Sequence, residues 1–129
     1  MVYRFIFKLV KKIFHQICTL IEVDLPLKYL GTPYGGWYFS EKSLPKKTTL
    51  LSAGVGEDIS FDIELLNNYN AKVYFVDPTP RSISYIDKVI ENLGKQNSAE
   101  FDIKSGNQPI EAYDLSSIQS DDFLLIKKA

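Results

Sequence analysis

The segment Leu50–Asp62, LLSAGVGEDISFD, decides the fold of this chain. An apolar run ends at two glycines, Gly54 and Gly56, which are separated by one residue. Two acidic residues follow, and then a helix-like pattern begins. An apolar run that stops at glycine is typical of a buried strand that turns sharply into a helix. The question is whether this turn holds a ligand or only connects two elements.

Downstream of this segment, strands and helices are predicted to alternate. Residues 48–54 predict a first strand, and residues 57–70 predict a helix that Asp58 or Ser60 caps. Residues 71–77 predict a second strand that ends on an acid. The clearest helix covers residues 78–94, with Thr79 as its predicted N-cap, Pro80 in the first helical position and Gly94 at its C-terminal end. Its apolar residues predict an inward face formed by Ile83, Ile86, Ile90 and Leu93.

Two more strands are expected in the last third of the chain. Residues 98–104 alternate Ala99, Phe101 and Ile103 with polar residues, and residues 122–129 form another apolar run. Strands alternating with helices indicate a parallel sheet in an α/β fold. We therefore expect a Rossmann-like parallel sheet of about four strands, with right-handed crossovers placing helices on both faces. The expected domains are a helix at 1–26, a connector at 27–47 and a partial ligand-binding domain at 48–129.

The first segment predicts an amphipathic basic helix. Phe5, Leu9, Ile13 and Ile17 share one side, whereas lysines lie largely opposite. Basic residues interrupt the apolar run too often for a spanning helix or a secretory signal. Two alternatives remain: residues 2–21 lie on an anionic membrane surface, or their apolar side packs on the domain. We expect a cytoplasmic protein, with peripheral contact at the inner membrane surface as the first alternative.

The connector at residues 27–47 combines turn residues with aromatic ones. Gly31, Pro33, Gly35, Gly36 and Pro45 predict an irregular path. Five aromatic residues crowd the same segment. Either they cover a flank of the core, or they form part of the lid or wall of a ligand pocket. These aromatic residues are Tyr29, Tyr34, Trp37, Tyr38 and Phe39.

Composition excludes several classes of function. The formal net charge is −1, which argues against a generally nucleic-acid-binding surface. Residues 1–47 contain eight Lys/Arg and three Asp/Glu, so a basic segment precedes an acidic domain. Cys18 is the single cysteine, so no intramolecular disulfide forms, and a reducing compartment is the simpler interpretation. With one histidine, His15, the chain offers no metal site and no obvious Ser–His arrangement.

The predicted strands bring a candidate site together. In a parallel sheet, ligands bind beyond the C-terminal ends of the strands, where the strand order reverses. Gly54 and Gly56 let the backbone turn and approach a ligand, and the next helix presents its N-terminal amides there. Asp77 follows the second strand, 23 residues after Gly54. A carboxylate in that position accepts hydrogen bonds from both hydroxyls of a ribose, so the sequence predicts a pocket for an adenosine-containing ligand.

The two acidic residues beside the turn, Glu57 and Asp58, help to identify the ligand. A dinucleotide fingerprint, G-x-G-x-x-G, needs a third glycine where this chain has Ile59. Asp58 at the helix start competes with a pyrophosphate for the same amides. Glu57 and Asp58 instead suit a ligand with a sulfonium or ammonium group, such as S-adenosylmethionine. A P-loop is not supported, because no G-x-x-x-x-G-K-[ST] is present.

At these residues the sequence resembles class I S-adenosylmethionine-dependent methyltransferases, most closely the FkbM type. "LLSAGVGEDISFD" followed by "VYFVDPTPRSI" is similar to the first two motifs of that family. The resemblance implies that Gly54 and Gly56 lie under the methionine portion of S-adenosylmethionine and that Asp77 holds its ribose. It also implies O-methylation of a small-molecule or glycan acceptor, with catalytic residues unidentified. The expected cofactor-binding residues are Ser52, Ala53, Gly54, Val55, Gly56, Asp58, Asp77 and Pro78.

The chain also departs from the family pattern. The family usually has an acid at the position of Ser52 and a third glycine at that of Asp58. Its sheet has seven strands in the order 3-2-1-4-5-7-6, and this chain supplies candidates for four. We therefore expect a truncated N-terminal portion of a methyltransferase, inactive on its own. The alternative is a non-catalytic nucleotide-binding or interaction module, with an oligomer or a completing partner chain left open.

Overall fold

The computed structural model describes residues 25–127, and these form two sheets and two α-helices. The expected N-terminal helix lies outside the described residues. Strands β1 (Leu27–Leu30) and β2 (Trp37–Ser40) form an antiparallel hairpin in the segment expected to be an irregular connector. Strands β3 (Thr48–Ala53), β4 (Ala71–Val76) and β5 (Phe123–Ile126) form a parallel sheet in the order β3-β4-β5. The α/β class with a parallel sheet is therefore confirmed.

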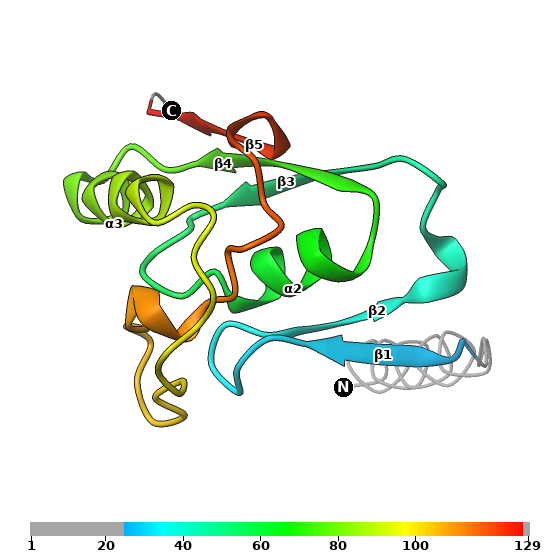
Figure 1. Ribbon diagram of the computed structural model, residues 1–129. Coiled ribbons are helices and arrows are strands. Elements are labelled where there is room, and N and C mark those ends of the chain that lie inside the picture. Colours follow the sequence, from blue (N-terminus) through cyan, green and yellow to red (C-terminus); the bar gives the residue numbers. More distant parts are fainter. Residues whose placement is uncertain (1–24, 128–129) are drawn as a thin grey trace, which may run out of the picture.

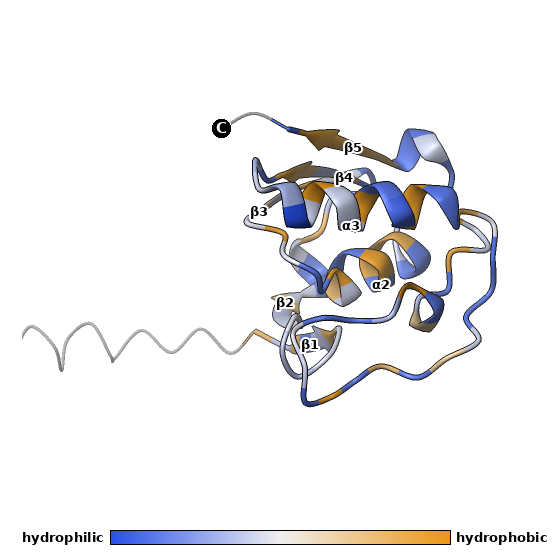
Figure 2. Ribbon diagram, turned by 90° about the vertical axis from the view of Figure 1, so that its left-hand side faces the viewer, coloured by the Kyte–Doolittle hydropathy of each residue, from blue (hydrophilic) through white to orange (hydrophobic). Residues whose placement is uncertain are grey.

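Helices α2 (Ser60–Asn68) and α3 (Pro80–Glu91) lie on the same side of the parallel sheet (Figures 1 and 2). Helix α2 is sandwiched between this sheet and the β1–β2 hairpin. Three short 3-10 turns complete the described elements: η1 (Glu41–Ser43), η2 (Ile110–Ala112) and η3 (Ser120–Asp122).

The expectation of helices on both faces is wrong for the described residues, and the strand order explains why. Val73 and Phe75 of β4 share one apolar cluster with Ile63 of α2 and Ile86 of α3. The chain moves from β3 to β4 to β5 in one direction across the sheet. Right-handed crossovers in one direction place every helix on the same face. The other face carries Leu51, which is 66% exposed, in register with Tyr74 and Leu124.

The third expected strand is also a correction. Residues 98–104 contain no strand, and the amides of Ser98 and Ala99 both donate to the carbonyl of Glu111 instead. Of the alternating residues, Phe101 packs against Tyr113 at 5.4 Å between ring centroids, whereas Ile103 is exposed. The alternation therefore does not correspond to a buried face, and this stretch forms a loop.

The last expected strand exists, but its neighbour differs from the one that the family order implies. That order places the fourth strand beside the first, whereas β5 pairs with β4 and leaves β3 at an edge of the sheet. Phe123 of β5 pairs with Val73 and is buried. The order of the described strands consequently never reverses, so the expected switch point is not present among them.

The helix boundaries follow local chemistry. Thr79 is the N-cap of α3 and accepts a hydrogen bond from the Ser82 amide, as predicted, with Pro80 in the first turn. Gly94 has φ +82°, and its amide donates to the carbonyl of Leu115. The buried face of α3 is rotated from the predicted one, because Tyr85 and Val89 are buried while Ile90 is exposed.

Two buried tyrosines link the helices to the loop that follows α3. The Ile59 amide donates to the Tyr113 hydroxyl (3.1 Å), and the Tyr85 hydroxyl donates to the carbonyl of Gln108 (2.8 Å). The two hydroxyls lie 2.9 Å apart. Because Tyr85 gives its only proton to Gln108, Tyr113 must be the donor between them. One directed chain of hydrogen bonds therefore runs from the start of α2 to the loop.

A membrane-crossing helix needs a long apolar stretch. Within residues 25–127 no helix combines the length and the apolar character that crossing requires.

The chain of hydrogen bonds through Tyr113 and Tyr85 gives a prediction about stability. Tyr113→Phe leaves the buried Ile59 amide without an acceptor, so we expect the free energy of unfolding to fall by about 1–3 kcal/mol. Tyr38→Phe is the matched control, because Tyr38 is 69% exposed and its change should stay within about 0.5 kcal/mol. Urea denaturation of the full chain measures both. Equal effects of the two substitutions would contradict a structural role for the buried hydrogen bonds of Tyr113.

Candidate functional site

The ends of β3 and β4 are joined at the turn that the sequence singles out. The Gly54 amide donates to the carbonyl of Val76 (3.0 Å). Gly54 and Gly56 have φ values of +70° and +65°, a region that favours glycine. A Cβ added at either position would meet no atom within 4 Å. The backbone conformation, and not crowding, therefore requires glycine here, and both Cα atoms face open space.

Asp77 binds the protein's own backbone at this point. One carboxylate oxygen accepts hydrogen bonds from the Thr79 amide (2.9 Å) and hydroxyl (2.7 Å). The other accepts a longer bond from the Gly56 amide (3.3 Å). Burial raises the pKa of Asp77, but hydrogen bonds from Thr79, Ser82 and Gly56 outweigh it and lower the pKa to about 2. The residue is 4% exposed and ionised, and it fastens the glycine turn to the start of α3.

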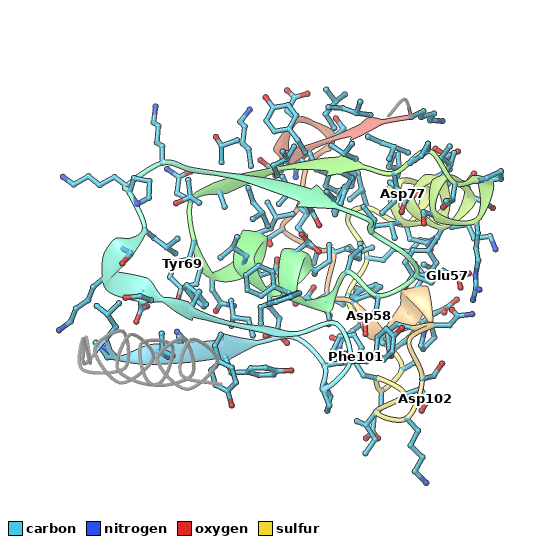
Figure 3. The ribbon with its side chains drawn as sticks, turned by 180° about the vertical axis from the view of Figure 1, so that it is seen from behind. Glu57, Asp58, Tyr69, Asp77, Phe101 and Asp102 are labelled. Carbon is cyan, nitrogen blue, oxygen red and sulfur yellow. The ribbon has the colours of Figure 1, made fainter. Side chains whose placement is uncertain are left out.

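Asp77 and the glycine turn line a cleft of about 610 Å³, which we call the Asp77 cleft. Its walls come from the β3–α2 turn, the β4–α3 turn, the hairpin turn and the loop after α3. In Figure 3, Asp77, Glu57 and Asp58 follow one another on the same side of the molecule, toward Phe101 and Asp102. The cleft is lined by Tyr34, Gly54, Val55, Gly56, Glu57, Asp58, Asp77, Thr79, Arg81, Ser82, Ser105, Gly106 and Asn107.

The buried carboxylate of Asp58 connects the segments that form these walls. Asp58 accepts hydrogen bonds from the Thr32 hydroxyl (2.6 Å), the Ser60 amide (3.0 Å) and the Gln108 side chain (3.3 Å). Gly35 packs directly on this carboxyl group, where a Cβ would clash with it. Asp58 thus joins the hairpin turn, the start of α2 and the loop after α3. Its oxygens serve the fold, and contact between this residue and a cofactor stays a prediction.

The loop wall is held by Gln108, which the sequence did not single out. Its side-chain nitrogen shares its two protons among the carbonyls of Asp102 (2.9 Å) and Ser105 (2.7 Å) and the more distant Asp58 carboxylate (3.3 Å). Its oxygen accepts from the Asp102 amide (2.8 Å). The ring of Tyr34 packs against Gly106, where a Cβ would overlap it. This contact brings the hairpin turn and the loop together at the cleft, so Tyr34 is part of a pocket wall, one of the two predicted alternatives. Phe39 takes the other role, because it packs on Phe61 in the core.

The charges at the cleft are arranged differently from the expectation. Glu57 forms an ion pair with Arg81 of α3, so its charge is compensated within the protein. The amides of Ile59 and Ser60 at the start of α2 are taken by Tyr113 and Asp58. These two amides are not offered to a ligand, contrary to the predicted role of the helix N-terminus. A pyrophosphate would not find them free there, which agrees with the inference against a dinucleotide.

The structure brings most of the predicted site residues together. Gly54, Val55, Gly56, Asp58 and Asp77 all line the Asp77 cleft. Ser52 and Ala53 line a second cleft, and Pro78 is exposed outside the Asp77 cleft. Arg81 and residues 105–107 also line the Asp77 cleft, although the sequence did not predict them as site residues. The signal for Arg81 was its position in the first turn of α3, directly after D-P-T-P.

The second cleft, of about 510 Å³, lies along the edge of β3 that pairs with no strand among residues 25–127. Asp62 of α2 lines it and is 5% exposed. Burial raises the pKa of Asp62 to about 6, although its own backbone amide and the Ser52 side chain lower it in part, and the charge of Asp58 adds to the rise. We call this the Asp62 cleft. Its lining residues are Tyr34, Gly35, Trp37, Leu50, Leu51, Ser52, Ala53, Gly54, Val55, Asp58, Phe61 and Asp62.

Comparison with protein-family models, with curated proteins and with solved structures gave no match. Among residues 25–127, no cluster of three or more His, Cys, Asp or Glu side chains is arranged to hold a metal ion.

The raised pKa of Asp62 predicts how stability depends on pH. The folded chain binds its proton more tightly than the unfolded chain, whose carboxyl has a pKa of 3.8. Stability should therefore fall as pH rises from about 4 to about 7. Asp62→Asn removes the cost of burying the charge, so it should stabilise the chain by about 1–3 kcal/mol at pH 7.5 and much less at pH 4.5.

Asp121→Asn is the control for this prediction, because Asp121 is exposed. Urea denaturation across this pH range measures both variants. A stabilisation by Asp62→Asn that is the same at pH 4.5 and pH 7.5 would contradict the assignment.

Proposed function

We propose that this chain is the cofactor-binding portion of an S-adenosylmethionine-dependent methyltransferase of the FkbM type. One observation carries the proposal: the glycine turn after β3 and the Asp77 carboxylate after β4 line the same cleft. A glycine-rich turn and an acid at adjoining strand ends are the arrangement that Rossmann-like folds use for the ribose of a nucleotide. The sheet found here, with β3 and β4 adjacent and parallel, is compatible with part of such a fold.

The residues present fit an adenosine-containing ligand. A volume of about 610 Å³ lies in the range of small-molecule sites, which is roughly 300–1,000 Å³. Asp77 is ionised and acceptor-only, so it is suited to the two hydroxyls of a ribose. Gly54 and Gly56 present open space in which the methionine portion fits without a Cβ in the way. The side chains of Ser105 and Asn107 on the loop offer hydrogen-bonding groups to the base.

The chemistry divides between the cofactor and the chain. When bound, S-adenosylmethionine supplies an activated methyl group on its sulfonium. The chain's contribution is to position the ligand, which is a large part of catalysis in a displacement reaction. Arg81, paired with Glu57, sits at the rim of the cleft and restricts it on the side of α3. The acceptor in this proposal is the hydroxyl of a small molecule or glycan, and no residue is assigned as its base.

A non-catalytic nucleotide-binding module is the second candidate. The observation that favours it is the full use of Asp77 within the protein, because both its oxygens already accept hydrogen bonds from Gly56 or Thr79. A ribose would share these oxygens or displace the 3.3 Å bond from Gly56. Both candidates require adenosine binding at this cleft, and they differ in whether a methyl group is transferred.

Calorimetric titration of the full chain tests the proposal. We expect S-adenosylhomocysteine to bind and NAD to bind more weakly. Asp77→Ala should weaken the binding of S-adenosylhomocysteine by about 1–3 kcal/mol, because a charged hydrogen-bonding group is lost. Absence of S-adenosylhomocysteine binding to the folded wild-type chain would contradict the proposal.

Two controls separate a ribose contact from a loss of structure. Asp87→Ala removes a partly exposed carboxylate of α3 outside the cleft lining, so S-adenosylhomocysteine affinity should stay within about twofold. Adenosine and 2′,3′-dideoxyadenosine differ only at the ribose hydroxyls. Asp77→Ala should weaken adenosine binding in an NMR titration and leave the dideoxy analogue unchanged. Equal losses for both nucleosides would show that Asp77 acts only through the fold.

A further inference from the structure

The Asp62 cleft is built from three parts of the chain, and the proposed function does not use it. The lining comes from β3, from the first turn of α2, from Tyr34 in the hairpin turn and from Trp37 at the start of β2. It shares Tyr34, Gly54, Val55 and Asp58 with the Asp77 cleft, so the two clefts adjoin at the glycine turn and the hairpin turn. A second ligand here would lie next to the first.

Asp62 is a buried polar group that the described structure leaves incompletely satisfied. One of its oxygens, Oδ1, is buried and has no hydrogen-bond partner within residues 25–127. A buried acceptor without a partner is costly, and native structures pair such groups with protein, water or ligand. Since Asp62 lines a cleft of about 510 Å³, a ligand in that cleft would lie next to its carboxyl group.

The charged residues that line the cleft determine whether it favours a cationic or an anionic ligand. Asp58 and Asp62 both contribute carboxylates, and among residues 25–127 the lining includes no Lys, Arg or His. Asp58 already accepts three hydrogen bonds, whereas Oδ1 of Asp62 accepts none from the described residues. The electrostatic field inside the cleft is therefore negative, and an anionic ligand would be repelled. A cation that donates to or contacts Asp62 would compensate its charge.

Aromatic rings complete the arrangement. Tyr34, Trp37 and Phe61 line the same cleft, and both Tyr34 and Trp37 are largely exposed, so their rings are accessible at its mouth. Aromatic faces attract organic cations, and recognition of alkylammonium groups by aromatic side chains is a recurrent use of this interaction. A hydrated metal ion would gain less here, because the described residues supply no cluster of three ligating side chains.

We propose that the Asp62 cleft binds a small organic cation of the alkylammonium class, with Asp62 as its counter-ion and the aromatic residues as its walls. This inference does not depend on the proposed methyl transfer. It adds a second binding site beside the Asp77 cleft and gives a role to Asp62, Trp37 and the outer edge of β3.

Tetramethylammonium is the probe, and Trp37 reports on it because the chain has a single tryptophan. We expect Trp37 fluorescence to change with a Kd in the millimolar range for tetramethylammonium. The uncharged tert-butanol, of similar size, should produce no saturable change. Equal responses to the two compounds would overturn the proposal.

Two isosteric variants on one helix make the test specific. Asp62→Asn should weaken tetramethylammonium binding at least tenfold. Glu64→Gln removes the same charge from α2 outside the cleft lining, where Glu64 accepts the Gly31 amide (2.9 Å), and should leave binding unchanged. Similar losses in both variants, or none in Asp62→Asn, would contradict a site at Asp62.

Binding should also depend on the protonation of Asp62. The groups that face it are Asp58 from the glycine turn, Ser52 from β3 and Tyr34 from the hairpin turn. A bound cation favours the ionised form, so saturating tetramethylammonium should lower the pKa of Asp62 in a carboxyl ¹³C NMR titration. An unchanged pKa would overturn the proposal. The titration repeated with saturating adenosine shows whether the two clefts fill independently, and competition between the ligands would contradict a separate second site.

Discussion

The buried carboxylate of Asp58 is the interaction on which the described structure depends most. Its hydrogen-bond donors are the Thr32 hydroxyl, the Ser60 amide and the Gln108 side chain, and they come from three separate parts of the chain. A buried charge is tolerated only when it is hydrogen-bonded. Satisfying Asp58 therefore fixes the hairpin turn, the start of α2 and the loop after α3 relative to one another. Both clefts are lined by residues from these segments.

The residues that follow local rules could be predicted from the sequence. Strands β3 and β4 have short apolar runs that end at glycine or aspartate, and they occur where expected. Helix α3 begins at its predicted cap, Thr79, because Thr-Pro favours a helix start in any context. The meeting of Gly54, Gly56 and Asp77 at one cleft was also predictable, because parallel strands end at the same edge of a sheet.

The features that were missed depend on contacts between distant segments. Alternation in residues 98–104 predicts a strand, but the neighbouring edge of β4 is occupied by β5, so no partner is left there. Strand order then decides that both helices share one face, and no local pattern encodes that order. The engagement of Asp58 with Gln108, 50 residues away, is of the same kind. An acid beside a glycine turn gives the same sequence signal whether it faces a ligand or the interior.

The two clefts give the glycine turn a double role. Its backbone lies between a cleft lined by Asp77 and Glu57, whose carboxylates are paired within the protein, and a cleft lined by Asp62. Oδ1 of Asp62 has no hydrogen-bond partner among residues 25–127. Gly54 and Gly56, which the positive φ angles favour, place no side chain at the intervening wall. A small movement of this turn would change both clefts together. The turn is therefore the part of the described chain in which ligand binding is expected to be visible first.

Backbone amide chemical shifts are the most direct measurement of ligand binding at the glycine turn. In a ¹⁵N-labelled sample of the full chain, S-adenosylhomocysteine should shift the amides of Gly54, Gly56 and Asn107, with smaller effects at Thr79 and Ser82. The amides of Leu27 and Tyr38, on the outer side of the hairpin, should not respond. Shifts with this distribution are the result that an adenosine site at the ends of β3 and β4 predicts. No shift at the glycine turn with millimolar ligand, or shifts confined to the hairpin, would contradict it.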